Sequence, residues 1–235
     1  MREGTMKAST LSAVAGAAVA GSLMAAPMPA ASAEPCSDVD VVFARGTGEP
    51  PGVGGVGQAF VDAVRTQAAG KSVSVYPVNY AASGDFANTT AFAQTVIDGV
   101  RDAGSHVEAT AANCPNTRII LGGYSQGAAV AGFVTSAQVP AGIPAAAVPQ
   151  PLPPGVADHV AAVALFGKPS EAWTARYGAP AITVGPAYAG KTTEQCAQGD
   201  TICDGTPGGE PSFAHALYPV NGMVGDAATF AVGRL

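Results

Sequence analysis

The sequence predicts one α/β domain, a parallel sheet with helices on both faces. Continuous apolar runs alternate along the chain with segments of helical periodicity. Strands that are buried on both faces of a parallel sheet are typically apolar throughout. One apolar run also leads through a glycine-flanked serine directly into a helix start, which is a strand–turn–helix unit.

The elements follow in order. Strands are expected at residues 39–44, 73–78, 119–121 and 160–166, with a fifth beginning at 182–184. Helices are expected at residues 57–67, 89–112, 126–134 and 220–232. The second helix places Phe92, Val96, Val100 and Val107 on one face. Residues 140–154 are rich in Pro and Ala and predict an extended surface loop.

The amino-terminal residues have the pattern of an export signal. Arg2 and Lys7 precede an apolar, Ala-rich stretch at 11–27, and Ala31-Ser32-Ala33 offers a cleavage site. We therefore expect a signal peptide at residues 1–33 and one domain at residues 34–235. An uncleaved membrane tether is the alternative. Export predicts a secreted protein, including one retained at the cell wall.

Charge and composition exclude several functions. The net charge is −6 with only 12% charged residues, and no basic block occurs, so nucleic-acid binding is not expected. The chain has four cysteines and three histidines. Their spacing does not match a zinc motif, so no metal site is expected.

The four cysteines predict two disulfides, since an even number in an exported chain usually pairs. Three pairings are possible. Cys196 and Cys203 are close enough in sequence to close one loop, which favours their pairing and leaves Cys36 for Cys114.

The serine unit is the main functional signal. Gly123-Tyr124-Ser125-Gln126-Gly127 matches the nucleophile elbow of α/β-hydrolases, a sharp strand-to-helix turn that exposes the serine hydroxyl. A glycine-rich turn without chemistry would have the same pattern. A helix start beneath the serine favours the negative charge that forms during acyl transfer.

A nucleophilic serine needs a base, and in this fold the base follows it in the chain. His106 precedes Ser125. His159 directly precedes a strand, at the end of the sheet opposite to the elbow. His215 lies in a later loop and is therefore the best candidate.

The acid that orients the base is left open by spacing alone. Asp200 and Asp204 both follow the expected fifth strand, and Asp200 is favoured because it lies within the Cys196–Cys203 loop. The oxyanion donors are expected to be the N–H of Gln126 and a group of Thr47, in the loop after the first strand.

With these residues, the chain resembles cutinases and the secreted cutinase-like esterases of actinobacteria. The likeness spans nearly all of residues 34–235 and includes Ala44-Arg45-Gly46-Thr47, the elbow, Cys196-x-x-x-Asp200-x-x-Cys203 and His215-x-x-Tyr218. It implies a compact α/β sandwich on a five-stranded parallel sheet, without a large lid. It also implies a catalytic triad of Ser125, Asp200 and His215, which decides against Asp204, and supports the cysteine pairing above. Relatives often have Ser where this chain has Thr47.

The resemblance implies a serine esterase that needs no cofactor and acts on lipidic or polyester substrates. A phospholipase or cell-envelope lipid esterase, and a catalytically weak surface or antigen protein, are the alternatives. We expect a monomer that makes transient contact with lipid interfaces. The apolar residues Phe213, Ala214, Leu217 and Val184 predict either a hydrophobic rim for acyl chains or simply core.

Overall fold

The computed structural model describes Met1 and residues 36–207 and 209–235. The expected signal peptide, Met1 aside, lies outside the described residues. Within the described part, no helix combines the length and the apolar character needed to cross a membrane.

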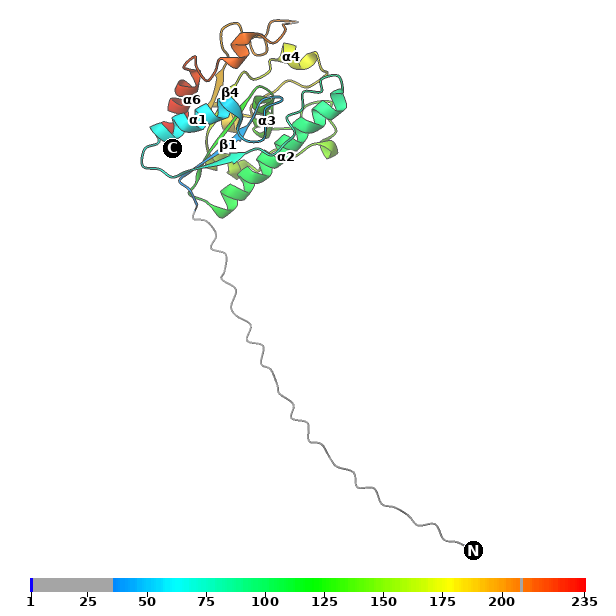
Figure 1. Ribbon diagram of the computed structural model, residues 1–235, viewed down its shortest axis with the longest axis vertical. Helices are drawn as coiled ribbons and strands as arrows, with labels where there is room; N and C mark the ends of the chain where they lie inside the picture. Colours follow the sequence, from blue (N-terminus) through cyan, green and yellow to red (C-terminus); the bar gives the residue numbers. More distant parts are fainter. Residues whose placement is uncertain (2–35, 208) are drawn as a thin grey trace. The chain divides into compact units, whose positions relative to one another are not determined.

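One sheet of five parallel strands forms the centre of the domain, in the order β2-β1-β3-β4-β5 (Figure 1). Strands β1, β3 and β4 are buried along almost their whole length, because each has a strand on both sides and helices on both faces. The strands are β1 (Val39–Ala44), β2 (Val73–Pro77), β3 (Arg118–Tyr124), β4 (Val160–Phe166) and β5 (Thr192–Gln195).

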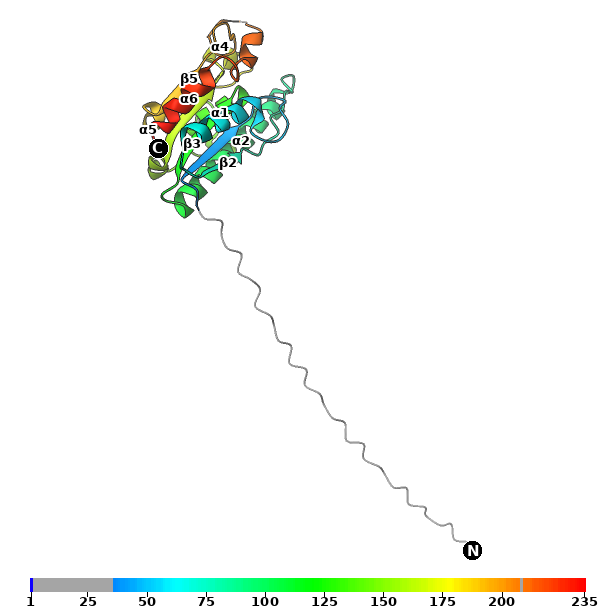
Figure 2. The same cartoon turned by 60° about the vertical axis from the view of Figure 1, so that its left-hand side comes forward.

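Helices cover both faces of the sheet, as the sequence predicts. Helices α1 (Gly54–Gln67) and α6 (Met223–Val232) lie side by side on one face (Figures 1 and 2). Helices α2 (Thr89–Asn113) and α3 (Gln126–Val134) pack together on the other. The shorter elements are η1 (Ala145–Ala147), η2 (Pro154–His159), α4 (Glu171–Ala175), α5 (Pro186–Ala189) and η3 (Phe213–Ala216).

The expected fifth strand at residues 182–184 is wrong. These residues form no strand, and the Ile182 side chain packs on α3, where a Cβ added to Gly132 would lie 2.4 Å from it. The fifth strand is β5, which pairs only with β4 and is partly exposed. An edge strand of this kind has no need of apolar residues, so Thr192–Gln195 carries no hydrophobic signal.

The other boundaries differ little from those expected. Helix α1 begins three residues earlier than predicted, and α6 begins at Met223, after Gly222 in the left-handed conformation with φ 90°. The predicted loop at 140–154 contains the short turn η1.

Both disulfides pair as the sequence favours. Cys36 joins Cys114, which ties the chain before β1 to the end of α2. Cys196 joins Cys203 and closes the loop after β5. Each bond therefore fixes a segment that adjoins a strand.

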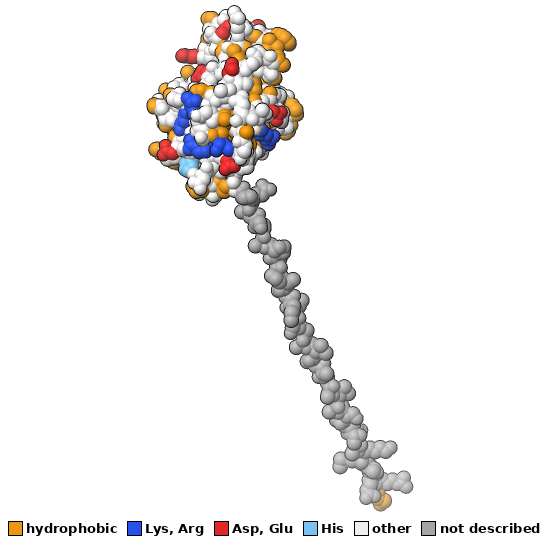
Figure 3. Space-filling view, turned by 90° about the vertical axis from the view of Figure 1, so that its left-hand side faces the viewer, with side chains coloured by type: hydrophobic (Ala, Val, Ile, Leu, Met, Phe, Trp, Pro, Cys, Tyr) orange, Lys and Arg blue, Asp and Glu red, His pale blue; other side chains and the backbone are white. Residues whose placement is uncertain are grey.

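Charges of both signs share the surface. On the face drawn in Figure 3, Lys and Arg side chains gather in the lower half, with acidic side chains among and above them. The acidic excess of the sequence is thus not concentrated in one patch on this face.

The backbone is closely packed where α3 begins. A Cβ added to Gly127 would lie 1.9 Å from the carbonyl oxygen of Ala44 in β1. A Cβ added to Gly123 would lie 2.1 Å from the carbonyl oxygen of Gly127. Both glycines are therefore needed for α3 to approach the sheet at this point.

We expect Gly127→Ala to destabilise the protein by about 3 kcal/mol or more, because the backbone of β1 must move to admit the methyl group. Urea unfolding measures this change. Gly155→Ala is the control, because nothing lies within 4 Å of the added Cβ. Equal midpoints for the two variants would contradict the close approach.

Candidate active site

Ser125 lies at the junction of β3 and α3 in a strained conformation. Its φ is 55° and its ψ is −118°, a region that non-glycine residues rarely adopt. Such a backbone costs about 1–3 kcal/mol and persists only where the surroundings impose it. The Ser125 N–H donates to the carbonyl of Phe166 at 2.8 Å, and the Ser125 carbonyl accepts from Ala128 at 2.9 Å. The turn thereby presents the serine at the carboxyl edge of the sheet.

His215 and Asp200 form a buried hydrogen-bonded pair. The Nδ1 atom of His215 lies 2.8 Å from Oδ2 of Asp200. Asp200 is fully buried in the disulfide-closed loop, and His215, on η3, is 9% exposed. The carboxylate can therefore hold the imidazole with Nδ1 protonated and Nε2 free to act as a base.

Two further donors hold the Asp200 carboxylate. The Tyr218 hydroxyl donates to Oδ2 at 2.6 Å, and the Ile202 N–H donates to Oδ1 at 3.1 Å. Burial by itself would raise the pKa of Asp200, but the hydrogen bonds from His215, Tyr218 and Ile202 outweigh it and lower the pKa. The ionised form is thus the one that the fold favours.

Glycine at position 167 is required by the His215–Asp200 pair. Gly167 follows β4 directly and has φ 56°. A Cβ there would lie 2.8 Å from Cε1 of His215 and 3.1 Å from Oδ2 of Asp200. Any side chain at this position would push the imidazole out of place.

Ser125 and His215 line one cavity of about 360 Å³, together with Thr47 and Gln126. Within the described part of the chain, the buried Nε2 atom of His215 has no hydrogen-bond partner. The structure therefore brings together four of the five residues expected at the reaction centre, and Asp200 lies behind His215.

The other candidates lie elsewhere. His106 lies 2.7 Å from Asp40, which is in the amino-terminal half of β1. His159 ends η2, just before β4, as expected. Asp204 is exposed just outside the disulfide loop.

Sequence reasoning did not assign roles to the residues that hold the Thr47 loop. The buried guanidinium of Arg45 donates to the carbonyls of Glu49, Val78 and Tyr80 and lies over the Tyr80 ring. The Glu49 carboxylate accepts from the N–H groups of Gly46 at 2.6 Å and Gly55 at 2.7 Å. The one sequence feature that could have indicated this role is an arginine directly after an apolar strand.

Tyr124 connects this loop with the histidine loop. Its hydroxyl donates to the carbonyl of His215 at 2.7 Å, and its ring lies where a Cβ on Gly46 would fall. Burial raises the pKa of the Tyr124 hydroxyl, so it remains a hydrogen-bond donor.

One group of possible metal ligands occurs among the described residues: Cys196, Asp200 and Cys203. Both sulfurs are in the disulfide, so neither is a thiolate that could bind a metal.

Of the two alternatives left open for the apolar residues around His215, a hydrophobic rim or core, the structure does not support the rim. Phe213 is 80% exposed and Val184 packs on the core, and neither they nor Ala214 and Leu217 line the Ser125 cavity. An aromatic wall takes that place, because the loops after β2 and β4 converge there. We define the wall as Phe86, Phe92, Trp173 and Tyr177.

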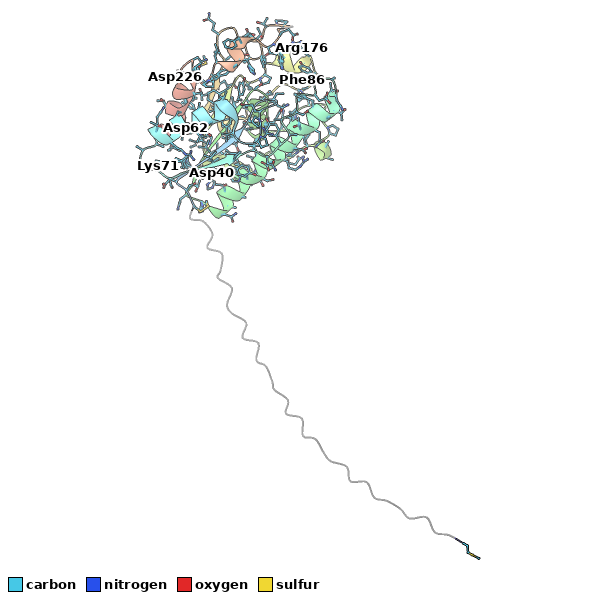
Figure 4. All side chains as sticks on the ribbon, in the orientation of Figure 1. Asp40, Asp62, Lys71, Phe86, Arg176 and Asp226 are labelled. Atoms are coloured by element: carbon cyan, nitrogen blue, oxygen red, sulfur yellow. A yellow bond between two sulfur atoms is a disulfide. The ribbon has the colours of Figure 1, made fainter. Side chains whose placement is uncertain are left out.

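The rings of this wall are in contact. Phe86 lies 4.7 Å from Phe92 and 5.2 Å from Tyr177 between ring centroids. In Figure 4, Phe86 of this wall and Asp40, the partner of His106, lie toward opposite ends of the described domain.

The chain matches one family pattern, and similar proteins are named as ester hydrolases. The pattern of one family, described as Cutinase, matches residues 35–235. A probable carboxylesterase, Culp7 of Mycobacterium tuberculosis, is 58% identical over 170 residues, which cover 72% of this chain and 89% of the relative. Phospholipase Culp4 of the same organism is 46% identical over 207 residues, covering 88% and 82%.

The fold has solved counterparts as well. A Trichoderma reesei cutinase in complex with a phosphonate inhibitor matches with a TM-score of 0.60 at 30% identity. The match covers 85% of this chain and 77% of that one.

The lowered pKa of Asp200 predicts how stability depends on pH. Its ionised form stabilises the folded protein fully above the unfolded-state pKa of about 3.9, and this stability is lost as pH falls through the lower folded-state pKa. We therefore expect the free energy of unfolding of wild type to exceed that of Asp200→Asn most at neutral pH. The difference should narrow below about pH 4.

Urea unfolding at a series of pH values measures this difference. Asp204→Asn, at an exposed carboxylate, is the control and should run parallel to wild type. A difference between wild type and Asp200→Asn that stays constant with pH would refute the prediction.

Proposed function

This chain belongs to the cutinase family, and on that premise we propose that it hydrolyses carboxylic esters by acyl transfer to Ser125. Membership confirms the resemblance inferred from the sequence. One observation supports the proposed mechanism. His215 is hydrogen-bonded to buried Asp200 through Nδ1 and lines the Ser125 cavity, and its Nε2 has no hydrogen-bond partner among the described residues. That arrangement suits a base beside its nucleophile.

In the first step the Oγ of Ser125 attacks the ester carbonyl carbon, and His215 Nε2 takes the hydroxyl proton. Asp200 remains ionised and stabilises the imidazolium that forms. The carbonyl oxygen becomes an oxyanion, for which the proposed donors are the Gln126 N–H and the N–H and hydroxyl of Thr47. The first N–H groups of a helix have no hydrogen-bond partner within that helix. Gln126 is the first residue of α3, so its N–H can donate to the oxyanion.

The tetrahedral intermediate then collapses. The bond to the alcohol oxygen breaks, and His215 gives its proton to the departing alcohol. Water enters, loses a proton to His215 and attacks the acyl-enzyme, after which the acid leaves and Ser125 regains its proton. The chemistry requires no cofactor.

We also propose that residues 34–235 are the mature domain, exported after removal of residues 1–33 and acting outside the cell or at its wall. The sequence pattern before residue 34 and the two disulfides support this, because disulfides persist in oxidising compartments. The proposed substrates are lipidic or polyester esters, met by a monomer in transient contact with lipid interfaces.

A phospholipase or cell-envelope lipid esterase is the second candidate. It is favoured by the 46% identity to a relative named as a phospholipase. The chemistry is the same, and only head-group preference separates the two. A non-catalytic surface or antigen protein would have no need of a strained Ser125 beside a buried, paired His215.

Replacing the nucleophile tests the mechanism. We expect Ser125→Ala to lower kcat/KM for p-nitrophenyl butyrate by about 10³-fold or more, since the acyl-enzyme can no longer form. A p-nitrophenyl phosphonate should add its phosphonyl group to wild type but not to the variant, as intact mass would show. Equal activity in wild type and Ser125→Ala would refute the role of Ser125, and hydrolysis of phosphatidylcholine in preference to simple esters would select the phospholipase.

The oxyanion role of Thr47 has its own test. Thr47→Val keeps the side-chain shape and removes the hydroxyl, so kcat for p-nitrophenyl butyrate should fall by about 10²-fold. Thr47→Ser keeps the hydroxyl, so its kcat should stay within about threefold of wild type. If Thr47→Val matched wild type, only the backbone at this position would remain a candidate donor.

A further inference from the structure

A second, larger cavity lies beside the Ser125 cavity. It measures about 780 Å³, within the range of about 300–1,000 Å³ that is usual for ligand pockets. Its walls are α2, α3 and residues 139–153, a segment with no role in the proposed chemistry. In Figure 1 this segment is the yellow-green chain beside α2. We call this cavity the α2 groove.

The groove is lined by apolar side chains that are only partly buried, and two of them, Val96 and Val100, also touch the edge of the core. On α2, Val96, Ile97 and Val100 line it and remain only partly buried, whereas Val107 farther along the same helix is fully buried. The apolar stripe of α2 is therefore fully buried at Val107, whereas at Val96 and Val100 it touches the core and also leaves apolar surface toward the groove.

The apolar side chains of residues 139–153 face the groove. Ile143, Val148 and Leu152 line it and are partly buried, while Ala145–Ala147 at the turn η1 is exposed. The Pro- and Ala-rich segment thus supplies the outer wall of a hydrophobic channel.

The two cavities adjoin. Three residues of the aromatic wall, Phe92, Trp173 and Tyr177, line both cavities. Gln126 and Pro169 also line both. Gln126 directly follows Ser125, so the groove begins one residue from the proposed nucleophile. An acyl chain attached at Ser125 could therefore run along apolar surface, first past the aromatic wall and then along α2.

We propose that the α2 groove holds the long alkyl chain of the acyl group, and that the substrates are therefore esters of long-chain fatty acids. This inference rests on the proposed function and deepens it. Each methylene group that leaves water for an apolar site gains a factor of about four in binding. When that gain is realised in the transition state, it raises kcat/KM.

Chain-length selectivity tests the inference. Wild type should hydrolyse p-nitrophenyl palmitate with a kcat/KM about tenfold or more above that for the butyrate. Gly104→Phe should lower this palmitate-to-butyrate ratio about tenfold or more. Among the described residues outside the neighbouring turns of α2, a Cβ at position 104 meets Leu152 alone, at 3.7 Å, and Gly104 itself lines the groove, so we expect the ring to extend into it.

Two further variants keep this test decisive. Val100→Phe fills the groove from a position one helical turn away, should Gly104→Phe not fold. Gly225→Phe on α6 makes the matched glycine-to-phenylalanine change where nothing lies within 4 Å, and it should leave the ratio as in wild type.

Binding can be measured without turnover. Trp173 is the single tryptophan of the chain and lines both cavities. In Ser125→Ala protein, a palmitate brominated along its chain should quench this fluorescence in a saturable way. Adding Gly104→Phe should weaken the binding about tenfold or more, and adding Gly225→Phe should not.

The outcomes separate the two claims. Butyrate hydrolysis that depends on Ser125, with no preference for palmitate and no quenching by the brominated chain, leaves the proposed function standing and overturns the groove. Equal palmitate-to-butyrate ratios in wild type and both groove-filling variants also overturn it. If no ester is hydrolysed, the proposed function fails and this inference fails with it.

Discussion

The buried carboxylate of Asp200 is the interaction on which the candidate site depends. It accepts hydrogen bonds from His215, from the Tyr218 hydroxyl and from the Ile202 N–H, so a charge without solvent has three donors around it. The Cys196–Cys203 bond closes the loop that carries it, and Gly167 leaves the space that it and the imidazole occupy. Removing one of these donors would leave the buried Asp200 charge less compensated and would cost stability. The His215 ring, the Tyr218 hydroxyl and the Ile202 N–H are therefore needed together.

A second constraint acts from the other side of the site. Ser125 keeps its unusual backbone because β3 and α3 meet through Gly123 and Gly127, whose backbones lie in direct contact with their neighbours. The Thr47 loop is fixed to the same framework by Arg45 and by the Glu49 carboxylate. Two parts of the fold, one carrying the serine and one carrying the histidine, therefore border one cavity.

In our proposal the Ser125 cavity and the α2 groove bind different parts of the substrate. The smaller cavity holds the groups proposed for chemistry, and the larger one offers apolar surface that suits an alkyl chain. The aromatic wall stands between them, since Phe92, Trp173 and Tyr177 line both. Selectivity for the acyl group would then come from the wall, from α2 and from the segment at 139–153, while the reaction itself would be common to esters in general.

Sequence alone predicted β1, α3 and β4 to the residue, because strands buried on both faces and a helix packed against them must be apolar throughout. It missed β5, an edge strand with polar residues, and it left open whether Phe213 belongs to a hydrophobic rim or to the core, whereas the structure exposes this side chain to solvent. It also selected Ser125, His215 and, through a family resemblance, Asp200, because their order and local motifs are encoded in short segments. Only the tertiary structure decided which apolar residues of α2 are core and which line a groove, and which distant tyrosines hold the site. Those roles depend on contacts between loops that are distant in sequence, and local sequence patterns do not show which distant loops come into contact.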